Sequence, residues 1–404
     1  MLKGSKSGRG RAWLQRAFSV AVLAAATGLV VQAGAQAATI KMGALLPLTG
    51  NDAVTGEVET NGINLAVKDI NGSGGISGRD LHAEIADMAA NPRTAVSAFQ
   101  FLLRSEDNPQ VVLTGFSSPT LAITPRATSE KVLLLNPWAD SPVLEGKSKY
   151  LVNVIPLGDL QAKVLVHYAI AEKGSKTFAA IYRNDDYGRS IDKEIRKFVA
   201  AFGGKYVGGE SFNPGEMQVK AQLTKIRALK PDAVYVISFG NETGTILKQA
   251  ADLDMHPQWL GPAPFENPNT IKIGGGESEG ALYVSPSTID PASGQEFEMA
   301  KHFYAEYSKA HGLAAGQIPN TALSAYNATM LVGHVMNEVS KSGQPLTGSN
   351  IRERLMKTKF VGVYGPMDFQ PNGTVIEPLA VKTVKNGKFT ILKSFTLSQI
   401  EALK

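Results

Sequence analysis

The sequence predicts an α/β protein with two lobes, each built on a parallel β-sheet. Short apolar runs alternate with stretches of helical periodicity along most of the chain, and this spacing is typical of βαβ units. The alternation stops at Pro156 and then restarts. Asn108-Pro109 and Lys230-Pro231 each precede an apolar strand that ends in a small polar loop. This weak internal repeat indicates two similar lobes.

The first run begins with an apolar strand at residues 40–46, which ends at Pro47. Helical periodicity follows at residues 59–70, and the four glycines of residues 71–78 end that helix because they favour turns. The run continues with a strand at 81–86, a helix that opens at Asn91-Pro92, and strands at 111–113, 132–135 and 150–155.

The second run repeats this order of elements. We expect helices at residues 159–172, after Tyr187-Gly188, at 217–229 and at 242–253, and strands at 178–182, 206–212, 233–237, 259–260 and 281–285. The late elements are helices at 297–310, 322–340 and 351–356 and strands at 362–369, 379–384 and 389–392. Their order indicates that these elements join the two lobes and do not form a third domain. Such sheets bind ligands beyond the carboxyl ends of their strands, so facing lobes form a cleft that a hinge closes.

Residues 111–120, VVLTGFSSPT, combine a buried strand with a polar loop. Ser118 is well placed to cap a helix that starts with Pro119. The free backbone N–H groups at that helix start favour a carboxylate or another polar ligand group. The alternative is structural, in which Ser117 and Ser118 only end a strand and start a helix.

Residues 1–37 have the composition of a secretory signal peptide. Five Lys or Arg residues precede an apolar run at residues 17–31, and Ala35-Gln36-Ala37 fits a cleavage site before Ala38. The apolar run is short for a membrane anchor and contains Gly28. We therefore expect export, with a mature chain that begins at Ala38.

Charge and composition exclude several classes of function. The formal charge of +5 comes from the five basic residues before Lys41, and 36 basic and 36 acidic side chains remain after them, so binding to nucleic acid through net charge is not supported. The chain has no cysteine, which excludes disulfides, thiolate metal sites and lipid attachment through cysteine. An exported protein of this kind fits a Gram-negative periplasm. The histidines lack metal-ligand spacing and no Gly-x-Ser-x-Gly elbow occurs, so we expect no metal, no cofactor and no enzymatic activity.

A series of motifs resembles the branched-chain amino acid binding proteins of ABC importers. It covers nearly all of the mature chain, in order. The motifs are IKMGALLPLTG (residues 40–50), INGSGGISGRDLHAEIAD (70–87), NDDYG (184–188), KPDAVYV (230–236), GESEGALYV (276–284) and YGPMDFQPNG (364–373).

The resemblance implies a type I periplasmic binding protein with two Rossmann-like lobes and a three-crossing hinge. The crossings are expected near Ile155, Ser285 and Phe369. The implied domains are a signal peptide at 1–37, a first lobe at 38–155 plus 286–368 and a second lobe at 156–285 plus 369–404. Such proteins are not enzymes. They capture a small solute in the periplasm and deliver it to an inner-membrane permease, and we expect a monomer.

The resemblance carries ligand-binding roles onto part of this chain. In the family, a serine loop binds the ligand carboxylate, and it matches Ser117 and Ser118. The family's second ligand loop corresponds to Trp138-Ala139-Asp140. Its cleft tyrosine matches Tyr187, whereas Phe239 replaces another tyrosine. Thr55 is a further candidate for contact with the ligand side chain.

One departure concerns the ligand's ammonium group. The acidic residue that holds the ligand's α-ammonium in the family corresponds to Ala263 in this chain. Glu266 lies three positions after Ala263. A buried ammonium needs a negative or strongly accepting partner, which leaves Asp140 or Glu266. Asp140 has an alternative role as a helix cap before Pro142, and Trp138 has one as packing between strand ends.

The sequence therefore leaves more than one ligand class open. A branched-chain or otherwise hydrophobic amino acid fits the family. Loss of the acidic residue and of a tyrosine, with Trp138 gained, also suits an amide, a urea-like compound or an aromatic acid. A sensor that passes the ligand state to a signalling protein is a third possibility, and a secreted enzyme a fourth.

Overall fold

The structure, a computed structural model, describes Met1 and residues 39–104 and 107–403. Apart from Met1, the expected signal peptide at residues 1–37 lies outside the described residues. Every helix in the described part of the chain is too short or too polar to span a bilayer.

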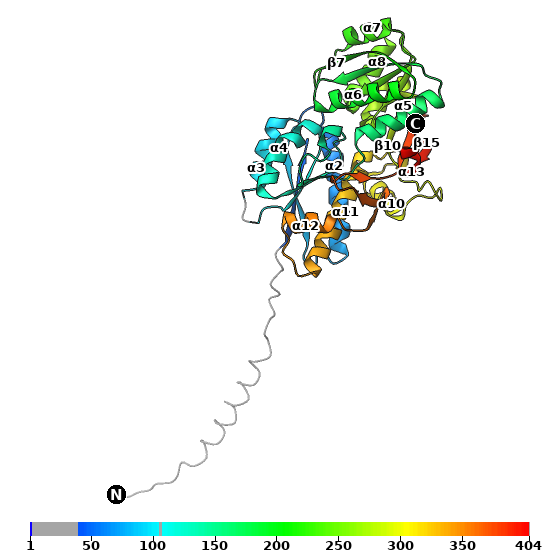
Figure 1. The fold of residues 1–404 in the computed structure, drawn as a ribbon. Coiled ribbons are helices and arrows are strands. Elements are labelled where there is room, and N and C mark those ends of the chain that lie inside the picture. The colour runs from blue at the N-terminus through cyan, green and yellow to red at the C-terminus, as the bar shows by residue number, and fades with distance from the viewer. Residues whose placement is uncertain (2–38, 105–106, 404) are drawn as a thin grey trace. The chain divides into compact units, whose positions relative to one another are not determined.

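A five-stranded, all-parallel sheet forms the centre of the first lobe (Figure 1). Ala44 in its middle pairs with Ile85 on one side and Leu113 on the other. In spatial order its strands are β2 (Leu81–Asp87), β1 (Ile40–Leu46), β3 (Val111–Thr114), β4 (Leu133–Asn136) and β5 (Leu151–Asn153). Helices cover both faces, which is why these strands are almost continuously apolar. The covering helices are α2 (Ala53–Gly72), α3 (Pro92–Leu102), α4 (Ser117–Glu130), α11 (Asn320–Lys341) and α12 (Gly348–Leu355), and α10 (Glu298–His311) packs on α2 and α11.

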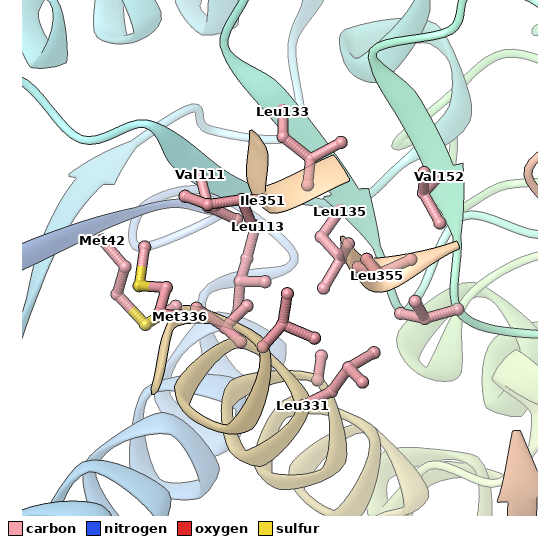
Figure 2. Packing of buried hydrophobic residues seen from close by; sticks show 14 of the residues in the cluster. Met42, Val111, Leu113, Leu133, Leu135, Val152, Leu331, Met336, Ile351 and Leu355 are labelled. Atoms are coloured by element: carbon pink, nitrogen blue, oxygen red, sulfur yellow. The ribbon is translucent and has the colours of Figure 1, made fainter. Parts of the chain in front are cut away.

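One face of this sheet is sealed by late elements of the chain. Figure 2 shows side chains of α11 and α12 packed against the strands. From the helices come Leu331, Met336, Ile351 and Leu355, and from the strands Met42, Val111, Leu113, Leu133, Leu135 and Val152. A small antiparallel sheet joins the same core and consists of β11 (Phe360–Gly362), β12 (Gly365–Phe369) and β13 (Val375–Ile376). The expectation of one strand at 362–369 was therefore wrong, because the chain turns back after Gly362.

A seven-stranded sheet forms the centre of the second lobe. Its first five strands in chain order are parallel, and two late strands add antiparallel at one edge. In spatial order the strands are β15 (Lys388–Phe395), β14 (Leu379–Lys385), β10 (Leu282–Pro286), β9 (Gln258–Gly261), β8 (Ala233–Ile237), β6 (Thr177–Arg183) and β7 (Lys205–Phe212). Its helices are α5 (Gly158–Ala171), α6 (Asp186–Ala201), α7 (Lys220–Ala228), α8 (Gly240–Ala251), α9 (Pro268–Gly274) and α13 (Leu397–Ala402).

The predicted α/β class with two parallel-sheet cores is confirmed. The chain passes between the sheets after β5, after β10 and after β13. The third passage follows Ile376 and not Phe369, because β13 still pairs with β12 and packs in the first core. The other lobe boundaries stay a prediction.

Helices α2 and α11 lie side by side in Figure 1, and Gly62 permits their close approach. A Cβ atom on Gly62 would collide with the backbone oxygen of Ala322 and lie 2.9 Å from the Cβ of Ala325. We expect Gly62→Ala to lower the free energy of unfolding by about 1–3 kcal/mol, because backbone must move to make room. Urea unfolding of the variant and of the unmodified protein measures this change.

Gly72→Ala is the matched control, because Gly72 ends the same helix with nothing within 4 Å of its Cβ position. Alanine favours the helix there, so stability should stay the same or rise. Equal unfolding free energies for the two variants would contradict the close approach of α2 and α11.

Candidate functional site

A cavity lies where loops from both lobes meet beyond the carboxyl ends of the parallel strands. The empty space at this position is about 430 Å³, a volume that includes open solvent at the mouth of the cavity. Seven of the residues predicted from the sequence line it: Thr55, Ser117, Trp138, Ala139, Asp140, Tyr187 and Phe239. Six further lining residues were missed: Glu59, Phe116, Gly240, Pro264, Asn267 and Thr321. The arrangement follows from sheet direction, since parallel strands end at the same edge.

The serine loop differs from its predicted form. Helix α4 begins at Ser117, and Phe116 is its N-cap residue with φ at +58°. The predicted cap at Ser118 and helix start at Pro119 are therefore wrong. Phe116 adopts a backbone conformation that bulky residues rarely take, and such strain clusters at functional sites. It places Ser117 in the first turn of α4, with its hydroxyl buried at the cavity.

Aromatic side chains form the walls of the cavity. Phe239 stacks on Tyr187 with ring centroids 5.1 Å apart and lies 4.7 Å from the ring of Phe116. Trp138 donates from Nε1 to the backbone oxygen of Thr321 at 3.1 Å. Trp138 is also part of the first-lobe core, so it packs between strand ends and lines the cavity at once. The walls therefore suit an apolar or planar group of a ligand.

Asp140 places a buried carboxyl group in this aromatic cavity. Its Oδ2 accepts a hydrogen bond from Nε2 of Gln161 at 3.2 Å. It does not cap the short helix that follows, because that helix, η1 (Pro142–Leu144), has Ser141 as its N-cap residue. Burial raises the pKa of Asp140 to about 7. Asp140 can therefore change its charge when a cationic group enters the cavity.

Gln161 joins Asp140 to the second lobe. Its amide nitrogen also donates to the backbone oxygen of Pro156 at 3.0 Å, and its oxygen accepts from the backbone N–H of Ala263 at 2.9 Å. Ala263, where the family's acidic residue was expected, therefore contributes a backbone N–H to this contact and no charge.

Glu59 is the most informative residue that sequence reasoning missed. It is 1% exposed, and it lies on the same face of α2 as Thr55, one helical turn away. A signal was present in the sequence, because Glu59 falls on the apolar stripe that continues through Ile63, Ala66 and Ile70. An acidic residue on a buried stripe indicates a specific partner or a site.

Three buried polar atoms of the cavity have no hydrogen-bond partner among the described residues. They are Oγ of Ser117, the hydroxyl of Tyr187 and Oε2 of Glu59. Leaving a buried polar group unpaired costs about 1–3 kcal/mol. Their convergence on one cavity therefore indicates that a bound solute supplies the missing partners.

Two predicted site residues lie elsewhere. Oε1 and Oε2 of Glu266 accept from Nζ of Lys382 at 3.1 and 2.9 Å, and Oε2 also accepts from the hydroxyl of Ser285 at 2.7 Å. Glu266 is thus occupied and does not line the cavity. Ser118 donates to Oδ2 of Asp186 at 2.8 Å, a bond between the two lobes.

A second bond between the lobes runs from the side-chain nitrogen of Asn241 to the backbone oxygen of Asn51 at 2.7 Å. With the bond from Ser118 to Asp186, it holds the lobes together beside the cavity. In the part of the chain that the structure describes, no group of three or more His, Cys, Asp or Glu could hold a metal ion.

The sequence of this chain is similar to those of known binding proteins. A family model described as "Periplasmic binding protein" matches residues 39–388. A leucine-, isoleucine-, valine-, threonine- and alanine-binding protein of Pseudomonas aeruginosa is 28% identical over 253 residues, which cover 62% of this chain and 68% of that protein. A leucine-specific-binding protein of Salmonella typhimurium is 27% identical over 271 residues, which cover 67% of this chain and 73% of that protein.

Solved structures share the fold. A leucine-binding protein from Thermotoga maritima has a TM-score of 0.80 at 22% identity and covers 89% of this chain and 99% of its own. A branched-chain amino acid binding protein from Streptococcus pneumoniae, in complex with isoleucine, has a TM-score of 0.78 at 24% identity, with 88% and 100% covered. A solute-binding protein from R. palustris in complex with benzoate has a TM-score of 0.77 at 19% identity, with 88% and 96% covered.

The buried carboxyl groups predict a pH dependence of stability in the protein without ligand. The pKa of Asp140 is raised in the folded state. Its contribution to the free energy of unfolding is therefore complete below its unfolded pKa near 4 and is lost as the pH rises through 7. Between pH 5 and pH 8 this loss is on the order of 2 kcal/mol. Asp140→Asn cannot ionise and should lose less stability over the same interval.

Urea unfolding of both proteins at pH 5 and pH 8 measures this difference. The other carboxyl groups are common to both proteins, so their titration cancels in the comparison. Parallel stability curves would show that Asp140 has an ordinary pKa and is not held in a dry cavity.

Proposed function

The chain belongs to the periplasmic binding protein family, and from this premise we propose that it captures an amino acid in the cavity between its lobes. A branched-chain or other hydrophobic amino acid agrees with the names of the curated relatives. The observation that carries the proposal is the set of unpartnered polar atoms on an aromatic cavity. The protein would deliver its ligand to the inner-membrane permease of an ABC importer, as a monomer and without catalysis.

Each part of an amino acid has a matching group in the cavity. The hydroxyl of Ser117 and the free N–H groups at the start of α4 suit the carboxylate, since that helix end attracts anions. The carboxyl group of Asp140 suits the ammonium, because Glu266 is occupied by Lys382. Trp138 and Phe239 offer apolar walls to the side chain.

Export through a cleaved signal peptide supports this role. Residues 1–37 have the composition of such a peptide, and cleavage before Ala38 would release the mature chain into the periplasm. The ligand would then meet the protein before it reaches the inner membrane.

A second ligand class is favoured by one observation. The raised pKa of Asp140 leaves part of its population protonated near neutral pH, and a protonated carboxyl group donates as well as accepts. An amide, a urea-like compound or an aromatic acid could then bind without an ammonium group. Ala263, which brings no charge to the cavity, agrees with that alternative.

A thermal-shift screen of the mature protein tests the two classes against each other. The panel holds leucine, isoleucine, valine, simple amides and aromatic acids. A ligand at about 100 times its dissociation constant adds roughly 2.7 kcal/mol to the folded state, which is readily seen. We expect shifts with amino acids. Shifts only with compounds that lack an α-ammonium would move the protein to the second class.

Asp140→Asn should weaken binding of an amino acid found in that screen by about 2–5 kcal/mol, because it removes the buried charge that pairs with the ammonium. Asp252→Asn is the control, since Asp252 is exposed and forms a surface ion pair with Lys220. Isothermal titration calorimetry compares the two variants with the unmodified protein. Unchanged affinity in Asp140→Asn would remove Asp140 from the ammonium site.

A further inference from the structure

The cavity has a second acidic position, on helix α2. Glu59 lines it with a carboxyl group that is almost fully buried. Thr55, one turn earlier on the same face, is small for a wall residue and leaves this carboxyl group accessible from the cavity. The amino-acid roles assigned to Ser117, Asp140 and the aromatic walls make no use of Glu59.

One carboxyl oxygen of Glu59 has no partner among the described residues. Its Oε2 neither accepts nor donates a hydrogen bond, and Glu59 forms no ion pair in this part of the chain. The guanidinium of Arg183, which lies over the ring of Phe239, is engaged, because it donates to Oδ2 of Asp185 at 2.9 Å and to both carboxylate oxygens of Glu242 at 2.8 and 2.9 Å. Protonation alone would not satisfy Glu59, since its hydroxyl would also lack an acceptor.

The surroundings of Glu59 are negative and not positive. Burial, and then the nearby carboxyl group of Asp52, raise the pKa of Glu59 well above its usual range. None of the described residues that line the cavity is Lys or Arg. An anionic group of a ligand would find no cationic partner at this position, whereas a cationic group would find an acceptor and would favour the ionised form of Glu59.

Asp140 and Glu59 reach the cavity from different elements. Asp140 lies in the loop after β4 and accepts from Gln161, whereas Glu59 lies on α2, one turn after Thr55. A neutral amino acid brings one ammonium group and one carboxylate. With Ser117 on the carboxylate and Asp140 on the ammonium, Oε2 of Glu59 keeps no hydrogen-bond partner.

We propose that the solute carries a second cationic nitrogen at the far end of its side chain and that Glu59 binds it. This inference rests on the proposed amino-acid function and narrows it to a basic amino acid. Such a side chain has an apolar stem and a charged tip. Trp138 and Phe239 line the cavity and fit the stem.

The test compares L-ornithine with L-norleucine, two amino acids of nearly equal shape that differ by a terminal ammonium in place of a methyl group. Calorimetric titration of the unmodified mature protein should give an affinity for ornithine at least about tenfold higher than for norleucine. This comparison needs no variant, so it stands even if substitution of Glu59 impairs folding.

Glu59→Gln removes the charge at nearly constant volume and should abolish the preference for ornithine. Glu57→Gln is the matched control, because Glu57 lies on the exposed side of the same helix, and it should keep the preference. Retention of the preference in Glu59→Gln would overturn the assignment of Glu59.

The outcomes separate this inference from the function on which it rests. Binding of norleucine or leucine without binding of ornithine would overturn the basic side chain and leave the amino-acid function standing. Absence of binding for all three amino acids, with the protein folded by circular dichroism, would overturn both.

Discussion

The buried carboxamide of Gln161 is the contact on which the geometry of the cavity depends. It donates to Asp140 and to the backbone of Pro156, and it accepts from the backbone of Ala263, so one side chain joins both lobes and the first passage between them. Each partner is buried, and loss of any of these bonds would leave an unpaired polar group. This bonding orients Asp140 and holds the backbone of Ala263, next to the cavity residue Pro264.

Much of the fold could be predicted because it depends on local patterns. The apolar strand at residues 40–46 and the strands ending near Thr114, Asn136 and Ile237 are confirmed, since a buried parallel strand needs a continuous apolar run. The loops after these strands then had to meet, which is why Ser117, Trp138 and Phe239 were found together. Helix α9 (Pro268–Gly274) was missed because its periodicity is too short to recognise.

The rest of the site depends on contacts between residues distant in sequence. Glu266 was expected at the ligand, but its carboxylate pairs with Lys382, more than a hundred positions away. Ser118 was expected to cap a helix, but α4 starts at Ser117, directly after Phe116 with its φ of +58°, and Ser118 donates to Asp186. No local pattern encodes such long-range pairs. Glu59 is different, because its place on an apolar stripe was visible and was not interpreted.

The two hydrogen bonds beside the cavity have a consequence for affinity. Ser118 to Asp186 and Asn241 to Asn51 join the lobes without touching the cavity, and each bond would be exchanged for water if the lobes separated. Together with the bonds of Gln161, they contribute to the fraction of empty molecules whose lobes are already together. Apparent affinity scales with that fraction, so polar residues on the rim tune how tightly every solute is held, while the cavity alone decides which solute it is.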